Sequence, residues 1–411
     1  MSTTEPTTDT GPTTDTGAAP AGTCPVHEFN HYLEKPYGEK MAFYDAIRDE
    51  APIVKNSFAE HFIVTRYEEI LAAYQNAKVF SNSAVTVFNP NPTTRWIPQM
   101  LDGDEHKQWR KNLNPLFSPK NVERLEEKVR HRAVELIQSI AAKGKCDFLQ
   151  DFALQYPSFI FLELMGMPFE DLDKFLHWED EILHISASPE EAARRRAAAS
   201  AELTEYFRVL IDERRADPRD DLISKAISFE INGQPATQED LESFCILMFM
   251  AGLDTVTATL ANTFLYLATH QEDRQAIVDD PELIPSAIEE ILRVFAIVIP
   301  SRKTLEDTEI AGCPIPKGSM VCLPLNAATR DDRQYEDAKE VHLDRHPNNH
   351  IAFGAGPHRC LGSHLARREL RIALEEWHKY IPNYRLSLES HPTEKGGQLG
   401  PVGSIYLEWD V

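Results

Sequence analysis

The chain is short of positive charge. Its 42 lysines and arginines are outnumbered by 65 aspartates and glutamates, which gives 411 residues a formal net charge of −23. Proteins bind phosphate backbones through clustered cations, so nucleic acid is excluded as an expected partner. Hydrophobic residues still make up 42% of the chain, which is enough for a large core. The composition therefore predicts a large, acidic, globular protein.

Cysteines are few and widely spaced, at positions 24, 146, 245, 313, 322 and 360. This spacing shows no disulfide framework, so reduced thiols in a cytosol are the simpler interpretation, and we expect a cytoplasmic protein. The N-terminus has no basic region followed by an apolar one, so we expect no signal peptide. The apolar stretch 244–253 is too short to span a bilayer, which predicts neither a membrane anchor nor a membrane partner.

Residues 1–22 lack the apolar side chains that a folded segment needs. They are mostly Thr, Asp, Pro, Gly and Ala, a composition that cannot bury enough apolar surface to offset the entropy lost on ordering. We expect a disordered tail there, followed by a single domain over residues 23–411.

One loop, by contrast, is rich in glycine and places a cysteine among cations. It reads His-Ile-Ala-Phe-Gly-Ala-Gly-Pro-His-Arg-Cys-Leu-Gly from position 350. Gly354 and Gly356 allow backbone conformations closed to other residues and let a flat ligand come close. His358 and Arg359 favour the thiolate form of Cys360. Because a helical apolar pattern follows, the sequence predicts a glycine-rich loop before a helix, with a thiolate suited to bind haem iron.

Two other interpretations apply to this cysteine. A lone cysteine beside a helix is more often a small buried hydrophobe. A zinc site from His350, His358, Cys360 and His364 is the other, but these residues lack the paired spacing that zinc sites prefer.

A long helix is predicted from Leu241 to about His270, about 45 Å at 1.5 Å per residue. Thr237 and Asp240 form a capping-box pattern before it. In its middle, Ala251-Gly-Leu-Asp-Thr255 places a glycine that costs about 1 kcal/mol relative to alanine. Taken alone, this pattern fits a tolerated kink whose threonine bonds its own backbone.

Several other patterns predict local structure. His106 and Arg110 share one face of a helix that begins near Asp102. Arginines 194–196 lie among alanines, which favours a solvated helix face. The stretch 312–325, with a Pro-Lys-Gly turn, predicts a β-hairpin.

Phe353-Gly-x-Gly-x-His358-x-Cys360-x-Gly362 resembles the haem-ligand loop of the cytochrome P-450 superfamily, and Ala251-Gly-x-Asp-Thr255 resembles its oxygen-binding motif. The resemblance implies a mainly α fold with small β-sheets and a long central helix over haem. It is closest to soluble bacterial members of the camphor-hydroxylating type. Such a protein is a monooxygenase that inserts one atom of O2 into a C–H bond.

The resemblance also implies roles for single residues. Cys360 would be the axial ligand of haem b, Thr255 would hydrogen-bond bound oxygen, and Asp254 would pass protons from solvent. The other residues implied to bind haem, the first four through its propionates, are His106, Arg110, Arg302, His358, Phe353, Gly354, Ala251 and Gly362. The residues implied to brace the cysteine loop are Glu290, Arg293 and Arg345.

The substrate pocket is expected to be mainly apolar, as suits a small hydrophobic ligand such as a terpenoid. Its predicted lining is Thr86, Val87, Phe88, Trp96, Leu247, Met250, Ala251, Ile297, Val298, Gln398 and Leu399. Electrons would come from a ferredoxin, of the [2Fe-2S] or a similar type, and its reductase. The ferredoxin would dock on a local basic patch near Lys107, Lys111, Arg359 and Arg368. We expect a monomer.

Other functions stay open on the sequence. The substrate could instead be a fatty acid, a steroid or an aromatic compound. A haem-thiolate enzyme that uses peroxide or isomerises its substrate is one alternative, although the intact Asp254-Thr255 pair favours O2 activation. A non-catalytic haem-binding or ligand-binding protein is the other, for which we would expect the threonine motif to be lost.

Overall fold

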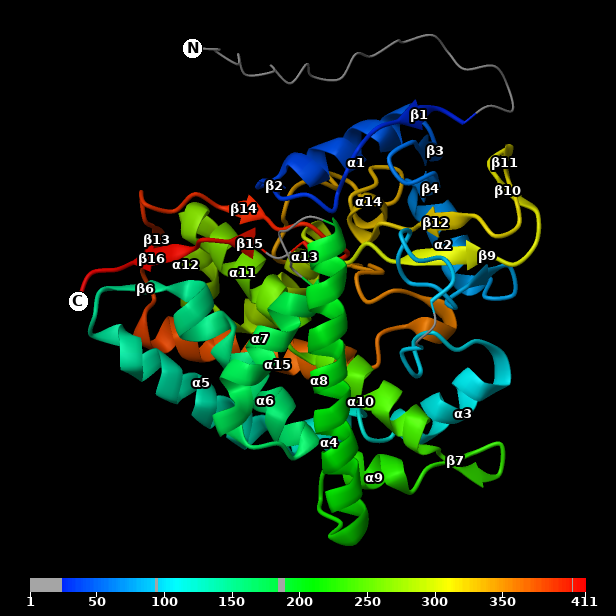
Figure 1. Cartoon of the computed structure of the whole chain (residues 1–411). Coiled ribbons are helices and arrows are strands. Elements are labelled where there is room, and N and C mark those ends of the chain that lie inside the picture. Colours follow the sequence, from blue (N-terminus) through cyan, green and yellow to red (C-terminus); the bar gives the residue numbers. More distant parts are fainter. Residues whose placement is uncertain (1–23, 93–94, 184–188, 401) are drawn as a thin grey trace, which may run out of the picture.

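The computed structural model describes residues 24–92, 95–183, 189–400 and 402–411, so the predicted disorder of residues 1–22 lies outside the described part. The predicted class, mainly α with small sheets, is confirmed (Figure 1). The α-helices are α1 (Glu39–Glu50), α2 (Tyr67–Gln75), α3 (Gly103–Leu113), α4 (Pro119–Glu123), α5 (Glu126–Ala141), α6 (Gln155–Met165), α7 (Leu172–Leu183), α8 (Pro189–Ala216), α9 (Leu222–Ile227), α10 (Gln238–Gly252), α11 (Asp254–Thr269), α12 (Gln271–Asp279), α13 (Ile284–Val294), α14 (Leu325–Thr329) and α15 (Ser363–Tyr380). Short helical turns are η1 (Leu149–Ala153), η2 (Phe169–Asp171), η3 (Pro281–Leu283) and η4 (Gly356–His358).

The strands form small sheets, the largest of which lies on one side of the molecule with α1 and α2 (Figure 1). It has the order β1-β3-β4-β12-β9-β5, from β1 (Val26–His27), β3 (Ile53–Asn56), β4 (His61–Val64), β12 (Met320–Cys322), β9 (Ser301–Thr304) and β5 (Phe80–Ser81). The smaller sheets are β10 (Thr308–Ile310) with β11 (Cys313–Ile315); β13 (Arg385–Leu386), β16 (Tyr406–Glu408) and β6 (Lys145–Asp147); β15 (Val402–Gly403), β14 (Thr393–Glu394) and β2 (Lys35–Pro36); and β7 (Glu230–Ile231) with β8 (Gln234–Pro235).

The predicted hairpin over 312–325 is wrong. β11 pairs with β10, whereas β12 pairs antiparallel with β9 and parallel with β4. The turn itself is present, because the Ser319 N–H donates to the Pro316 carbonyl. The local residues therefore specify the turn, but distant strands decide the pairing.

The long central helix is interrupted where one continuous helix was predicted. α10 ends at Gly252 and α11 begins at Asp254, with Leu253 between them. The Thr255 and Thr257 hydroxyls donate to the carbonyls of Ala251 and Leu253, both at 2.9 Å. Side chains that bond the carbonyl four residues back bend helices, which accounts for the break. The predicted capping box is present, with Thr237 and Asp240 bonded reciprocally.

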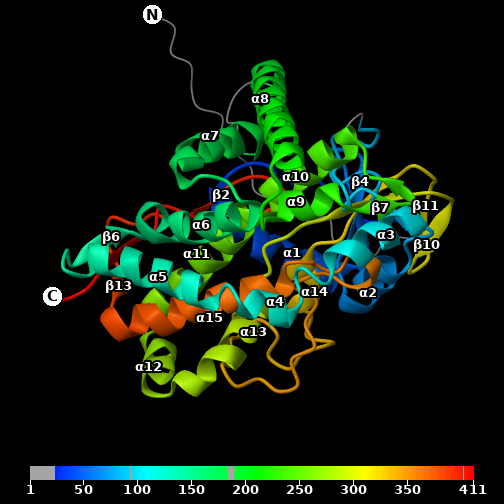
Figure 2. The ribbon, with the colours of Figure 1, turned by 90° about the horizontal axis from the view of Figure 1, so that it is seen from below.

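Residues 238–269 are long and apolar enough to cross a membrane by length and composition alone, but 72% of the relevant window is buried inside the protein. Burial of this kind is typical of a core helix. Seen from below, α15 runs across the molecule close to α5 and α13, while α8 projects from the opposite side (Figure 2).

Three apolar cores meet at the cysteine loop. Phe353 packs against the core formed mainly by α5, α11, α13 and α15. Ala355 packs against the core around the six-stranded sheet, and Leu361 packs against the core between α3 and α7 to α10. The loop is therefore held from three sides.

We expected reduced thiols throughout the chain, and this expectation is wrong for one pair of cysteines. Cys24 and Cys313 form a disulfide, with their Cα atoms 5.7 Å apart, although the two residues are separated by 289 in sequence number. The bond links the chain just before β1 to β11. Cysteines 146, 245, 322 and 360 are free.

Candidate active site

The backbone of the cysteine loop depends on its glycines. Gly354 and Gly356 have φ values of 69° and 67°, a conformation that other residues rarely adopt. A Cβ on Gly356 would also clash with the carbonyl oxygen of Tyr74. The Cys360 N–H donates to the Phe353 carbonyl at 2.9 Å and closes the loop.

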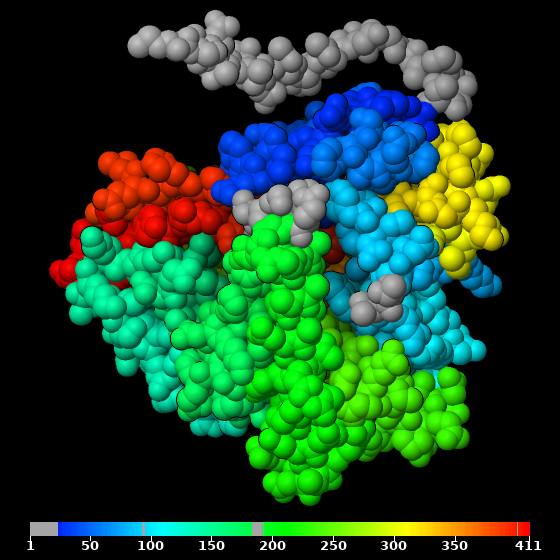
Figure 3. All heavy atoms as spheres, viewed as in Figure 1, coloured from blue at the N-terminus to red at the C-terminus, as the bar shows by residue number. Residues whose placement is uncertain are grey.

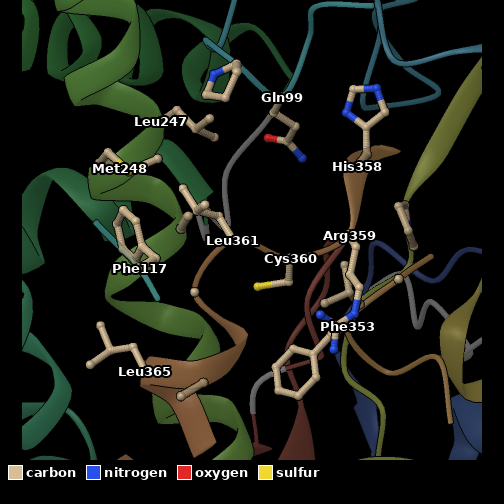
Figure 4. A pocket seen from close by; sticks show the side chains of 18 of the residues that line it. Gln99, Phe117, Leu247, Met248, Phe353, His358, Arg359, Cys360, Leu361 and Leu365 are labelled. Carbon is tan, nitrogen blue, oxygen red and sulfur yellow. The ribbon is translucent and has the colours of Figure 1, made fainter. Parts of the chain in front are cut away.

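The Cys360 thiol points from this loop toward the helix that carries Leu247 and Met248 (Figure 4). It lines a cavity of about 300 Å³, and its exposure is to this cavity. Burial raises the pKa of the thiol, and the Gly362 N–H and the arginines around it offset this only in part. The cations therefore do not make a thiolate by themselves, contrary to our expectation. A bound metal cation would do so.

Four cationic or titratable side chains converge on the same cavity. They are His106 and Arg110 from α3, Arg302 from β9, and His358 from the cysteine loop. The His106 and His358 rings lie 4.0 Å apart, centre to centre. Burial, helped by the nearby His358 and Arg110, lowers the pKa of His106 to about 4.

Few negative charges lie near these four side chains. Asp102 lies 3.1 Å from His358 Nε2, and the Arg302 guanidinium lies 4.9 Å from the centre of the Tyr74 ring. Arg110 donates to the Arg359 carbonyl at 3.0 Å. A cavity edge with this excess of donors suits an anionic ligand group, such as the two carboxylates of haem.

The rest of the cavity is largely apolar. The predicted haem-contact residues Phe353, Gly354, Ala251 and Gly362 all line it. Sequence reasoning missed further lining residues, including Tyr74, Phe117, Pro157, Phe161, Val256 and Leu365. An apolar cleft with a thiol on its floor and cations at its edge fits haem, and His106, Arg110, Arg302, His358 and Cys360 are the residues that would hold it.

A second cavity of about 600 Å³ adjoins the first, because Gln99, Leu247, Ala251 and Val298 line both. The predicted pocket residues that line it are Thr86, Phe88, Trp96, Leu247, Met250, Ala251, Val298, Gln398 and Leu399.

Two predicted pocket residues lie elsewhere. Val87 packs into the core around the six-stranded sheet, and Ile297 lines neither cavity. Lining residues that sequence reasoning missed include Tyr32, Asn89, Met100, Ile182, Arg196 and Ser200. They come from segments far apart in sequence, so no local pattern could have united them.

Thr255 lines the second cavity, and its hydroxyl donates to the Ala251 carbonyl. Asp254 is buried and lines neither cavity. Glu179 of α7 is also buried, and one of its carboxyl oxygens lacks a hydrogen-bond partner in the described structure. Burial and the negative charge of Asp254 raise the pKa of Glu179 well above its usual range. Nothing in the sequence pointed to this second carboxyl.

Glu290, Arg293 and Arg345 meet beside the segment 336–348, which leads into the cysteine loop. Glu290 accepts hydrogen bonds from Arg293 at 2.7 and 2.8 Å and from Arg345 at 2.8 Å. Asn348 and the His342 N–H also donate to this carboxylate. We call these three charged side chains the brace.

The zinc interpretation is not supported by the geometry. Within the described residues, no group of three or more His, Cys, Asp or Glu side chains is arranged to hold a metal ion. His350 instead pairs with Glu289 at 2.9 Å, and His358 pairs with Asp102.

The predicted docking patch is partly neutralised. Lys107 pairs with Asp104 at 2.8 Å, and Arg368 pairs with Glu126. Lys111 and Arg359 form no ion pair within the part of the chain that the structure describes.

The whole chain is similar to known proteins in sequence and in fold. A cytochrome P-450 family model matches residues 26–395. The chain is 32% identical to the mycinamicin IV hydroxylase/epoxidase of Micromonospora griseorubida, over 84% of this chain and 89% of that protein. It is also 32% identical to the steroid C26-monooxygenase of Mycolicibacterium smegmatis, over 79% and 81%. Among solved structures, CYP101J2 is similar, with a TM-score of 0.86, 33% identity, and coverage of 97% of this chain and 100% of that one.

Proposed function

The chain belongs to the cytochrome P-450 family, and we propose that this monooxygenase hydroxylates a compact hydrophobic substrate, a terpenoid or similar lipid. The observation that carries the proposal is the pair of adjoining cavities, one with Cys360 on its floor and the other lined by Thr255. Bound substrate would thus lie next to the cavity that contains the thiol. The closer resemblance to camphor-hydroxylating members stays a prediction.

The family implies a haem with a cysteine ligand, and Cys360 is the residue that would supply it. Haem, when bound, supplies O2 activation, and a thiolate ligand favours O–O cleavage. The chain's own contribution is to hold that ligand rigidly, through the brace and the closed loop, and to bind the propionates through His106, Arg110, Arg302 and His358.

Proton supply falls to residues at the helix break. Thr255 lines the substrate cavity, and its hydroxyl donates a hydrogen bond to the Ala251 carbonyl. When that bond breaks, the hydroxyl can donate its proton into the cavity. Asp254 lies one residue earlier and is buried near Glu179, whose pKa is raised well above its usual range by burial and by the negative charge of Asp254. These two carboxyl groups would replace the proton that Thr255 gives up.

Cys360 gives the most direct test. The reduced protein under CO should show the absorption of a thiolate-ligated haem, and Cys360→Ala should abolish it because Cys360 is the one thiol among the described residues that line that cavity. Cys245→Ala removes a buried thiol of α10 and is the matched control. A Cys360→Ala protein with an unchanged CO spectrum would refute the assignment.

The substrate class rests on the apolar lining of the second cavity. The names of the relatives mention a mycinamicin and a steroid, so they do not select one class. Terpenoids should shift the spin state of the ferric protein in a spectral titration, and mass spectrometry should find hydroxylated products. If terpenoids and short fatty acids all leave the spin state untouched, this substrate class is wrong.

We also propose that electrons arrive from a separate ferredoxin that docks near Lys107, Lys111, Arg359 and Arg368. Because Lys111 is unpaired in the described structure and Lys107 is paired with Asp104, Lys111→Glu should slow reduction by the ferredoxin at low salt more than Lys107→Glu does. Equal reduction rates in wild type and Lys111→Glu would place the docking surface elsewhere.

A further inference from the structure

Three consecutive arginines of α8 have three different environments. Arg194 pairs with Glu191 through two nitrogens, at 2.7 to 3.2 Å, and Arg195 pairs with Glu181 of α7. Arg196 instead lines the 600 Å³ cavity. The predicted solvated face holds for Arg194 and Arg196, which are both exposed, but Arg196 also borders this cavity.

Arg196 is oriented without being neutralised. Its Nε donates to the Ile182 carbonyl at 2.9 Å, which anchors the guanidinium to the end of α7. Within the described residues, no carboxylate lies within ion-pair distance of it, and its two Nη groups form no hydrogen bond. Four N–H donors are thus left for a ligand.

Among the described residues that line this cavity, Arg196 is the one charged side chain. Neutral hydrogen-bonding side chains also line this cavity: Tyr32, Thr86, Asn89, Gln99, Ser200 and Gln398. A planar guanidinium with two free Nη groups matches a carboxylate, which can accept from both at once.

The position of Arg196 suggests how a ligand would lie. Leu247 and Ala251 line both this cavity and the cavity that contains Cys360, so they define its inner end. Arg196 is exposed and sits on α8, the ridge at the surface beside the light-blue segment that precedes α3 (Figure 3). An apolar body directed inward would place an acidic end at Arg196.

We propose that Arg196 binds the carboxylate of an amphiphilic substrate, so that the natural substrate is a compact hydrophobic acid oxidised at a carbon remote from its acid group. This proposal rests on the proposed function, because the monooxygenase reaction carries out the oxidation. It adds to that function the chemical class of the substrate. The body of the acid would contact the apolar lining while the carboxylate stays at the opening of the cavity.

The test uses two pairs of probes, each with one carbon skeleton: perillic acid with perillyl alcohol, and decanoic acid with 1-decanol. Dissociation constants are measured by equilibrium dialysis with the haem-loaded protein at fixed ionic strength. Arg196→Gln removes the charge, Arg196→Lys keeps it, and Arg194→Gln removes a neighbouring charge that is already paired. Thermal unfolding shows whether each variant is folded.

In Arg196→Gln, the binding of the acids should weaken about tenfold, the effect of losing one charged hydrogen-bonded contact. The alcohols should change by less than about twofold, and Arg194→Gln should behave like wild type. Arg196→Lys should retain part of the preference for acids, because it keeps the charge but loses the planar fork.

The proposal is overturned if wild type binds neither acid more tightly than its alcohol, if Arg196→Gln leaves the acids unaffected, or if Arg194→Gln weakens them equally. A missing thiolate signature under CO in the same samples would instead refute the proposed function. Dialysis does not depend on that signature, so the two failures are distinguishable.

Discussion

Glu290 is fully buried, and its carboxylate is the centre of the brace. Burial alone would raise the pKa of this group, but the hydrogen bonds from Arg293 and Arg345 outweigh it, and the net pKa is lowered. The carboxylate therefore stays ionised at neutral pH. Because Arg345 precedes the cysteine loop in sequence, the Glu290–Arg345 ion pair links α13 to the segment that leads into that loop.

Glu290→Gln should lower the free energy of unfolding by about 3–5 kcal/mol, because the fully buried Arg293 and the partly buried Arg345 would lose their counter-charge. Urea denaturation measures this change. Glu289→Gln is the matched control, since Glu289 is also paired, with Arg367 and His350, but is partly exposed. Its loss should be about 1 kcal/mol or less. Equal losses would mean that the brace has no special role.

Single residues differ in how far the sequence predicted them. Cys360 and Thr255 stand in short contiguous motifs, so their place in the site could be read before the structure was known. The pKa of Cys360 could not, because burial depends on the whole surrounding cavity. Arg196 was assigned to a solvated face and is exposed as expected, but three adjacent arginines give no sign of which one borders a cavity.

Among the elements, local signals gave the helix starts and turns but not the strand partners. The start of α10 follows from its capping box, whereas β12 pairs with β4, more than 250 positions earlier in sequence. Strand pairing of this kind depends on tertiary contacts rather than on local sequence. The disulfide was missed for the same reason.

The Cys24–Cys313 disulfide predicts a definite thiol count. Denatured protein without reductant should show four free thiols, and with reductant six. Cys24→Ser should lower the unfolding temperature, since a bond that closes so long a loop contributes on the order of 5 kcal/mol by chain entropy. Six free thiols before reduction would restore our original expectation for this pair.

At the scale of the whole molecule, two buried histidines make stability depend on pH: His61, in β4 of the six-stranded sheet, and His31, close to it. All four ring nitrogens of His31 and His61 lack hydrogen-bond partners in the described structure, and the rings lie 6.1 Å apart. Burial lowers the pKa of His31 to about 3, helped by the nearby His61 and Lys40, and burial lowers that of His61 to about 4.

An unfolded histidine titrates near pH 6.5, at about the ordinary value. Between that pH and about 4 the unfolded chain binds more protons than the folded one, so stability is full above this range and is lost as the pH falls through it. Urea unfolding should show a decline from pH 7 to pH 5 that is shallower in His31→Leu. His131→Gln, at an exposed site, should follow wild type. A decline of equal slope in His31→Leu would exclude this cause.

The division of the site between two sets of elements has a practical consequence for directed evolution. Cys360 lies on a loop that packs against three cores, whereas Arg196 belongs to α8, a helix on the surface. A mutant library confined to α8 and to the loop before α3 would therefore vary the ligands accepted while leaving the supports of Cys360 unchanged. Catalysts for new substrates could be selected from such a library with little loss of folded protein.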